Sequence, residues 1–247
     1  MADITVTTAS GALLEAMSGD ILQGYRGNWT MELILTTTPA TAPTGKVSVD
    51  FHGVTYRGVV YRAGEDQGTW SMLIGGGAGG LYKQVAAKNY DNTMSLRLPV
   101  QELLSAAGEV LSPLSSAAVL GQTIGSWPRS ALEAGTLLDE LVSFAGPNAV
   151  WRVLPDGTVF VGIDTWGAPQ QNGVNAKAGR DYTLTSTDPV RAEQTIFPLT
   201  GPIYAPGQLV EGRKVGRVVY QDDGDEFSAW LFYLDEGGDS TDDLVVA

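Results

Sequence analysis

Glycine and proline divide this chain into short runs of β-branched and aromatic residues, and that punctuation constrains the fold more than any other feature. Of the 247 residues, 31 are glycine and 12 are proline. The runs between them include WTMELILTTT at 29–38 and KVSVDFHG at 46–53, in which apolar and polar side chains alternate. Alternation with period two is typical of strands with one buried face. We therefore predict a mainly antiparallel β protein in which helix is the minority.

The first β region is expected to cover residues 1–75. Besides the two runs above, it contains VTYRGVVYRA at 54–63 and TWSMLI at 69–74. Prolines and glycines separate these runs, which predicts short strands joined by turns. We expect one small antiparallel β-barrel or sandwich here.

Residues 76–166 show a different pattern, which predicts a small α/β middle domain. In the segment VQELLSAAG after Pro99, the apolar residues lie on one helical face, and proline suits the first position of a helix. A second helix is signalled by Thr136 and Asp139 at capping-box spacing, with an apolar stripe that ends at Gly146. A short third helix is expected at 115–121.

A hairpin and a second β region complete the chain. Pro155-Asp156-Gly157 lies between two strand-like runs of 150–166 and predicts a tight turn. In the second barrel region, 167–234, a loop rich in Gly, Asn and Gln precedes strand-like runs from 182 onward. This region is short for a complete barrel, so strands of 150–166 are candidates to complete it. Residues 235–247 form an acidic tail.

Composition excludes several classes of site. The chain has no cysteine and a single histidine, His52, so thiolate zinc sites, iron–sulfur clusters, cysteine nucleophiles and histidine-rich metal sites are excluded. The net charge of 15 − 28 = −13 argues against nucleic-acid binding through phosphate neutralisation. We expect no cofactor and no metal.

The sequence also lacks export and membrane signals. The start, Met-Ala-Asp-Ile-Thr-Val, has neither the basic nor the apolar region of a signal peptide. The longest uncharged stretch, 110–128, is interrupted by Ser, Gly, Gln and Pro, which is unsuited to a membrane span. We expect a soluble protein without a membrane segment.

The glycine run GGGAGG at 75–80 formally satisfies the G-x-G-x-x-G pattern of dinucleotide sites. There the glycines let a pyrophosphate approach backbone amides at the start of a helix, here LYKQVAAKNY. The surrounding runs are antiparallel β rather than alternating strand and helix, so a flexible or closely packed loop is the favoured interpretation.

The remaining candidate residues are acidic or aromatic. The acidic group Asp222, Asp223, Asp225 and Glu226 lacks the spacing of a calcium loop and is interpreted as the solvated tip of a hairpin. His52 is expected at the surface, and Asp20 in a Gly19-Asp20 turn. Trp127, near Arg129 in the irregular segment GSWPRS, is a candidate interface anchor, with internal packing as the alternative.

The order of several segments resembles the hub proteins of phage tail baseplates. The matching series, within about 45–166, is GVTYRGVV, WSMLIGGGAGGL, QELLSAAGEVLS, SWPRS, TLLDELVSFAG and WRVLPDGTVFVG. Residues 206–234 fit the later barrel of that family more loosely. The resemblance implies two tail-tube-like antiparallel β-barrels that flank or brace the helix-containing middle domain, and a structural protein rather than an enzyme.

The resemblance also implies partners. Three copies would form a ring of pseudo-sixfold symmetry that joins the tail tube or distal tail protein above to a spike or tip protein below. The tape-measure protein and later the DNA would occupy the channel, and edge strands would pair between copies. The protein would be assembled in the host bacterial cytoplasm and carried in the virion baseplate. Expected interface residues are Gly75, Gly76, Gly77, Gly79, Gly80, Trp127 and Arg129.

Two alternative functions remain open from the residues alone. One is a carbohydrate-active enzyme that uses two carboxylates, since 28 acidic residues offer many pairs. The other is a glycan-binding β module in which Trp127 or Trp166 stacks on sugar. Neither has a paired motif in the sequence.

The negative charge is concentrated near the C-terminus. Residues 1–217 hold 15 basic and 19 acidic side chains, a net charge of −4, whereas residues 218–247 hold nine acidic and no basic side chains, a net charge of −9. We therefore predict that the C-terminal hairpin either faces the path of the DNA, which it would repel, or meets a basic partner.

Overall fold

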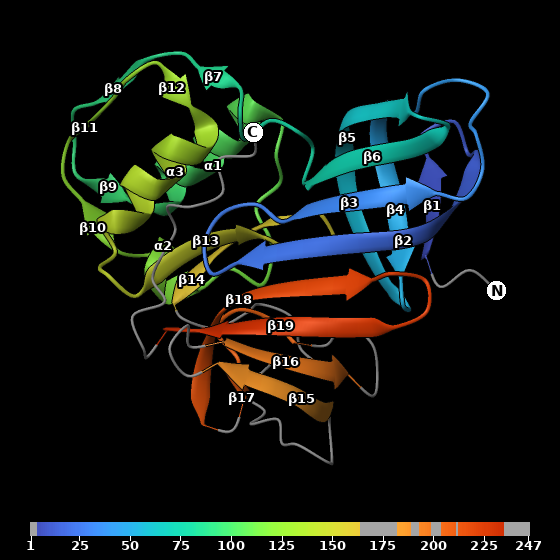
Figure 1. Cartoon of the computed structure of the whole chain (residues 1–247). Coiled ribbons are helices and arrows are strands. Elements are labelled where there is room, and N and C mark those ends of the chain that lie inside the picture. Colours follow the sequence, from blue (N-terminus) through green and yellow to red (C-terminus); the bar gives the residue numbers. More distant parts are fainter. Residues whose placement is uncertain (1–3, 164–181, 189–192, 199–203, 211, 235–247) are drawn as a thin grey trace.

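The computed structural model of the chain describes residues 4–163, 182–188, 193–198, 204–210 and 212–234. It is mainly β with few helices, and it contains a closed six-stranded antiparallel barrel, which confirms the predicted fold class. Figure 1 shows the barrel on the right, the helical part on the upper left and a second group of strands below. No helix of the described residues is long and apolar enough to cross a membrane.

The first six strands close into the barrel. Each pairs in antiparallel fashion with the next in the order β1-β4-β5-β6-β3-β2, and a β1–β2 pairing closes the cycle. Their bounds are β1 Ile4–Thr8, β2 Leu13–Gly24, β3 Thr30–Leu35, β4 Gly45–Phe51, β5 Val54–Asp66 and β6 Thr69–Gly76. Strand β2 continues through Gly19 and Asp20, so the prediction of a turn at these two residues is wrong. Gly19 is a buried strand residue, packed against Leu33.

Two of the hairpin turns have the same form. His52 and Gly53 join β4 to β5, and Gln67 and Gly68 join β5 to β6, with positive φ at all four residues. Two-residue loops of this kind match the right-handed twist of paired strands.

The middle domain is a ribbon wrapped around helices. Its three short antiparallel pairs are nested as β9–β10, β8–β11 and β7–β12, and the ribbon arches over α1 and α3 in Figure 1. The strands are β7 Gln84–Val85, β8 Lys88–Tyr90, β9 Met94–Ser95, β10 Thr123–Ile124, β11 Trp127–Arg129 and β12 Leu132–Glu133. The helix considered for 81–90 is therefore wrong, because the segment pairs as β7 and β8 instead.

The three predicted helices are present, with shifted starts. α1 spans Arg97–Ala107, α2 Ala117–Leu120 and α3 Ala134–Ser143. Pro99 is the third residue of α1, where an N–H also has no partner within the helix. Thr136 lies inside α3, whose N-cap is Glu133, and Asp139 instead accepts a hydrogen bond from the Trp151 indole. The predicted capping box is therefore wrong.

The predicted hairpin is confirmed. β13 Ala149–Val153 and β14 Val159–Ile163 pair with each other, and Gly157 has a φ of 81° in the turn between them. Because these strands form their own two-stranded sheet, they do not complete the second β region, and that expectation is wrong for the described residues.

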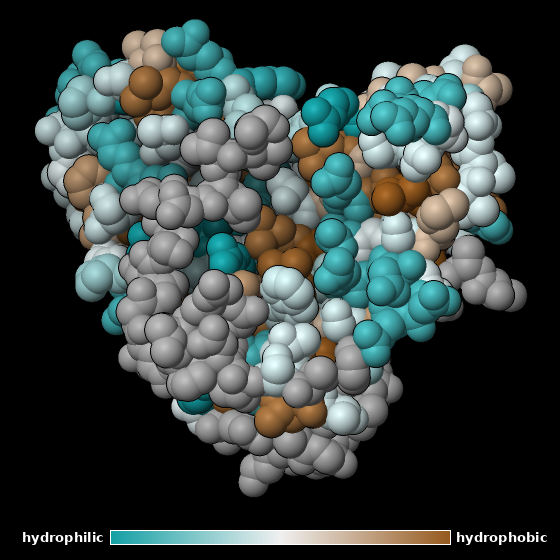
Figure 2. Space-filling view, viewed as in Figure 1, coloured by the Kyte–Doolittle hydropathy of each residue, from teal (hydrophilic) through white to brown (hydrophobic). Residues whose placement is uncertain are grey.

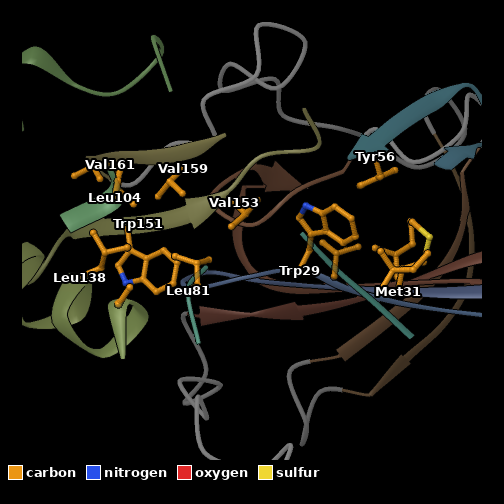
Figure 3. Packing of buried hydrophobic residues seen from close by; sticks show 14 of the residues in the cluster. Trp29, Met31, Tyr56, Leu81, Leu104, Leu138, Trp151, Val153, Val159 and Val161 are labelled. Carbon is orange, nitrogen blue, oxygen red and sulfur yellow. The ribbon is translucent and has the colours of Figure 1, made fainter. Parts of the chain in front are cut away.

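This hairpin fastens the middle domain to the barrel. Gly27 exchanges backbone hydrogen bonds with Trp151 and Val153, and the Arg57 N–H donates to Pro155 O at 2.7 Å. The Trp29 indole donates to Leu154 O at 3.2 Å. Figure 3 shows Val153 between the Trp29 and Tyr56 packing of the barrel and the Trp151, Leu138 and Leu104 packing of the middle domain. One apolar core therefore runs through both parts.

The second β region is an open sheet in the described residues. Its order is β18-β19-β16-β15, with β17 also paired to β18. The bounds are β15 Tyr182–Asp188, β16 Glu193–Pro198, β17 Leu209–Val210, β18 Arg213–Asp222 and β19 Phe227–Tyr233. The predicted strands and terminal hairpin are present, whereas the predicted loop 167–181, Trp166 and the tail 235–247 lie outside the described residues.

Candidate functional surface

Strand β2 joins the two β regions into one continuous sheet. Its first residues, Leu13–Ala16, pair with β1, and its last residues, Gly19–Gly24, pair with β18. A bulge between Ala16 and Ser18 separates the two parts, and bulges bend a strand and redirect its pairing. The result is one sheet of eleven strands, in which eight follow one another in the order β5-β6-β3-β2-β18-β19-β16-β15. We call this run of strands the eight-stranded sheet; β1 and β4 close the barrel beside it, and β17 pairs with β18.

One face of this sheet is buried, and across its centre the opposite face is exposed. Across the centre, Leu33, Ile21 and Tyr220 occupy the buried face. Their sequence neighbours Glu32, Asp20 and Gln221 lie side by side on the opposite face and are exposed. Trp230 of β19 also lies on that face and is 40% exposed. We call this the outer face of the sheet.

The outer face contains an acidic groove. Asp20 and Glu32 are direct cross-strand neighbours, and Asp66, Asp222 and Asp223 line the same groove. Asp20 is exposed at the sheet surface but partly enclosed by the groove, and this partial burial, and secondarily the charge of Glu32, raises the pKa of Asp20 above its usual range. In Figure 2, hydrophilic side chains gather over the part of the view where Figure 1 places β2, β3 and the β18–β19 tip. Among the described residues that line the groove there is no lysine or arginine.

The predicted acidic hairpin tip is divided between exposed and buried residues. Asp223, Asp225 and Glu226 are exposed, and the Asp223 carboxylate accepts the N–H groups of the other two. These two hydrogen bonds hold the pKa of Asp223 below its usual value. Asp222 is the last residue of β18 and is only 7% exposed.

Asp222 faces the one histidine of the chain, which overturns the surface prediction for His52. His52 Nε2 lies 2.6 Å from Asp222 Oδ2, and the imidazole stacks on Phe227 with ring centroids 4.1 Å apart. The β4–β5 turn of the barrel therefore contacts the β18–β19 hairpin. Sequence alternation beyond Phe51 misplaced His52 because the chain turns at that residue and the strand pattern ends.

The glycine run is packed within the chain. Gly75 and Gly76 end β6, where a Cβ would lie 2.1 Å from the Tyr61 ring and 2.5 Å from Trp29, respectively. Gly77 and Gly80 are also buried, and Gly79 is half-buried. The close backbone approach expected at these glycines thus occurs inside the chain, so their burial requires no neighbouring subunit.

Trp127 and Arg129 also pack inside the chain. The Trp127 ring is 1% exposed, stacks on Tyr90 with centroids 5.5 Å apart, and donates its indole N–H to Glu140 at 2.9 Å. Arg129 Nε donates to Ala86 O at 3.0 Å. Trp127 therefore packs inside the chain, which was the alternative to its role as an interface anchor. It also leaves no ring face free to stack on sugar.

The free edges of the eight-stranded sheet lie at its two ends. At one end, no described strand pairs with β15 on the side away from β16. At the other, β5 pairs with β4 only up to Val60, so its residues Arg62–Asp66 pair with β6 alone among the described strands. Free edges expose backbone N–H and C=O groups that another strand can pair with.

The described residues hold no group of three or more His, Asp or Glu side chains arranged to bind a metal. What they present is an acidic outer face, two free edges and a hydrogen-bonded, apolar contact between the barrel and the middle domain. Sequence reasoning missed Asp20 and Glu32. Gly19, Ile21 and Gln23 are buried at every second position of β2, but Ala16 lies three positions before Gly19 because of the bulge, so the sequence shows only a partial alternation. The Gly-Asp pair obscured it by suggesting a turn.

Comparisons with known proteins show likeness in fold. No protein-family model matches the sequence, and no curated protein sequence matches it. A 43 kDa tail protein of prophage MuSo2 from Shewanella oneidensis superposes with a TM-score of 0.69 at 11% identity, covering 94% of this chain and 97% of that chain. A tail protein from Neisseria meningitidis gives a TM-score of 0.66 at 12% identity, covering 94% and 96%.

A third structure extends the likeness to secretion systems. It is an Escherichia coli component of the type VI secretion system, described as structurally similar to the T4 bacteriophage tail proteins gp27 and gp5. It superposes with a TM-score of 0.62 at 10% identity, covering 90% of this chain and 73% of that chain. The chain therefore has the fold of phage tail proteins along nearly its whole length.

Proposed function

We propose that the protein is a structural component of a phage tail, the baseplate hub, in which three copies form a ring around a channel. The observation that carries this proposal is the fold shared with two tail proteins over 94% of the chain. The ring would join the tail tube or distal tail protein to the spike, and the tape-measure protein and DNA would pass through it. No catalytic role is part of this proposal.

The eight-stranded sheet supplies a way to close the ring. The β15 edge of one copy would pair with the Arg62–Asp66 edge of the next, because these two edges lie at opposite ends of one sheet. Such a contact is head-to-tail, and rotation about an axis closes it into a ring. Each copy contributes four strands from each β region, which suits pseudo-sixfold symmetry within a trimer.

The outer face of the sheet would then line the channel. Asp20 and Glu32 lie at its centre, and the exposed acids Asp223, Asp225 and Glu226 lie at the β18–β19 tip. A negative wall repels the phosphate backbone, so DNA would slide without being held. The protein would be assembled in the bacterial cytoplasm and carried in the virion.

Engineered disulfides test the ring directly, because the natural chain has no cysteine. Cysteines are placed in pairs, one at positions 62–66 and one at 183–186, and the purified chain is oxidised. We expect at least one pair to give covalent multimers ending at a cyclic trimer on non-reducing gels, with threefold rings in electron micrographs. The matched control is Lys46→Cys with Ser186→Cys, because β4 is enclosed within the closed barrel order. A monomer throughout the scan, with no rings, would overturn the proposal.

A further inference from the structure

The glycine loop that follows β6 holds a carboxylate from its own chain. The Ala78 N–H donates to Glu109 Oε2 at 2.8 Å, and the Gly80 N–H donates to Glu109 Oε1 at 2.6 Å. Each carboxylate oxygen therefore accepts one backbone amide. Glu109 lies directly after Gly108, which caps the end of α1, so the contact joins the middle domain to the end of a barrel strand.

The backbone conformation of Gly77–Gly80 lets the Glu109 carboxylate come close to the loop. Gly77 and Gly79 have φ values of 83° and 79°, a conformation that favours glycine. A Cβ on Gly77 would lie 2.7 Å from Glu109 Oε2, and one on Gly80 would lie 1.9 Å from Ala107 O. Side chains at either position would displace the carboxylate or the end of α1.

Backbone amides are the hydrogen-bond partners of this buried carboxyl group. Glu109 is 5% exposed. The ion pairs of the described residues are His52–Asp222 and Lys88–Glu102, so no described cation pairs with Glu109. Successive backbone N–H groups can form a concave anion site without a basic side chain, and hydrogen bonds from N–H groups to a carboxylate are among the stronger ones in proteins.

We propose that Gly77–Gly80 is an anion-binding loop for a carboxylate, and that Glu109 is its built-in ligand, which fastens the middle domain to the barrel. The G-x-G-x-x-G spacing thus does provide amides for an anion, but the anion belongs to the chain itself. This inference is independent of the proposed ring, because every contact in it lies within one chain.

Chemical rescue tests the proposal. Glu109→Ala empties the loop, and formate, whose two oxygens match a carboxylate, is the probe. We expect the variant to unfold at a temperature lower by about 5 °C, and the Ala78 and Gly80 amides to exchange with solvent roughly tenfold faster or more. Formate at about 100 mM, compared with chloride at equal ionic strength, should slow this exchange and recover part of the lost melting temperature.

Two further variants make the result decisive. Glu109→Gln keeps the side-chain volume but sets an NH₂ group against one backbone N–H, so it should show the faster exchange even if the alanine variant does not fold. Glu102→Ala removes another carboxylate of the middle domain, one held by Lys88 and Tyr90, and should give no formate effect at the loop. Unchanged amide exchange in Glu109→Gln, or no formate effect in a folded Glu109→Ala, would overturn the proposal.

Discussion

The two β regions differ in whether their sheet closes. The first closes on itself through the β1–β2 pairing, whereas the second, in the described residues, ends at β15 without closing. Closure removes the backbone groups that another chain could pair with, and an open end retains them. The comparison suggests that the first region is the more self-contained one, with only Arg62–Asp66 of β5 left as a free edge, whereas the second region ends in the whole free edge of β15.

Their buried faces differ as well. The barrel is filled mainly by aliphatic and aromatic side chains around Trp29. The open sheet buries more polar atoms: Tyr220 exchanges two hydrogen bonds with the backbone of Tyr204, and the Tyr233 hydroxyl contacts Gln194. Apolar packing tolerates no large void, whereas a polar core depends on each hydrogen bond being made.

The largest expected effect is the loss of a tryptophan from the closed barrel. Trp29 is 1% exposed and meets Tyr56 edge to face, so Trp29→Ala should lower the free energy of unfolding by about 4 kcal/mol. The matched variant Trp230→Ala, on the outer face of the open sheet, should cost less than about 1 kcal/mol. Urea titrations followed by circular dichroism measure both. If the two variants lose similar amounts of unfolding free energy, the closed barrel is no more sensitive to the loss of a tryptophan than the outer face of the open sheet.

A smaller effect is expected in the polar core of the open sheet. The Tyr220 hydroxyl accepts the Tyr204 N–H and donates to the Tyr204 carbonyl, both at 2.6 Å. Burial raises the pKa of Tyr220 well above its usual value, so the hydroxyl keeps its proton. Tyr220→Phe should cost about 2 kcal/mol, and Tyr56→Phe in the barrel, which loses one bond from Gln23, about 1 kcal/mol. Equal costs by urea titration would show that the two cores do not differ in this respect.

The smallest effect concerns the outer face. Because the pKa of Asp20 is raised by burial and by Glu32, the folded chain keeps this proton to a higher pH than the unfolded chain. The stability that this group contributes is complete below its ordinary pKa of 3.8 and is lost as the pH rises through the raised value. Asp20→Asn should therefore stabilise the protein at pH 7, by about 0.5 kcal/mol given partial exposure.

The advantage of Asp20→Asn should disappear in acid, where wild-type Asp20 is also neutral. Thermal unfolding at a series of pH values gives this comparison, with the exposed Asp91→Asn of the middle domain as the control. If Asp20→Asn is less stable than the wild type at pH 7, folding does not disfavour the charged form of Asp20, and the prediction is wrong. If Asp20→Asn does stabilise the protein, the wild-type chain keeps a repulsive Asp20–Glu32 pair at a cost in stability, which is consistent with a role for negative charge on the outer face.

The sequence predicted an element correctly wherever the contacts that form it are between residues close together in the chain. The Pro155-Asp156-Gly157 turn, the amphipathic α1 and α3, and the terminal hairpin all depend on neighbours a few residues away. The prediction failed where a distant partner decides the conformation. Gly19 and Asp20 form a strand because β3 and β18 pair on either side of them, and local turn propensity yields to two ladders of hydrogen bonds.

The sequence by itself determined a mainly β chain with a helical insertion, no cysteine or histidine cluster, and a negative charge concentrated near its end. Alternation, turn residues and composition are local properties, so they needed no coordinates. Only the tertiary structure decided that β2 belongs to both β regions, that His52 meets Asp222 across 170 positions, and that Glu109 fills the glycine loop. Those contacts join residues far apart along the chain, and no local pattern records which distant groups folding will bring together.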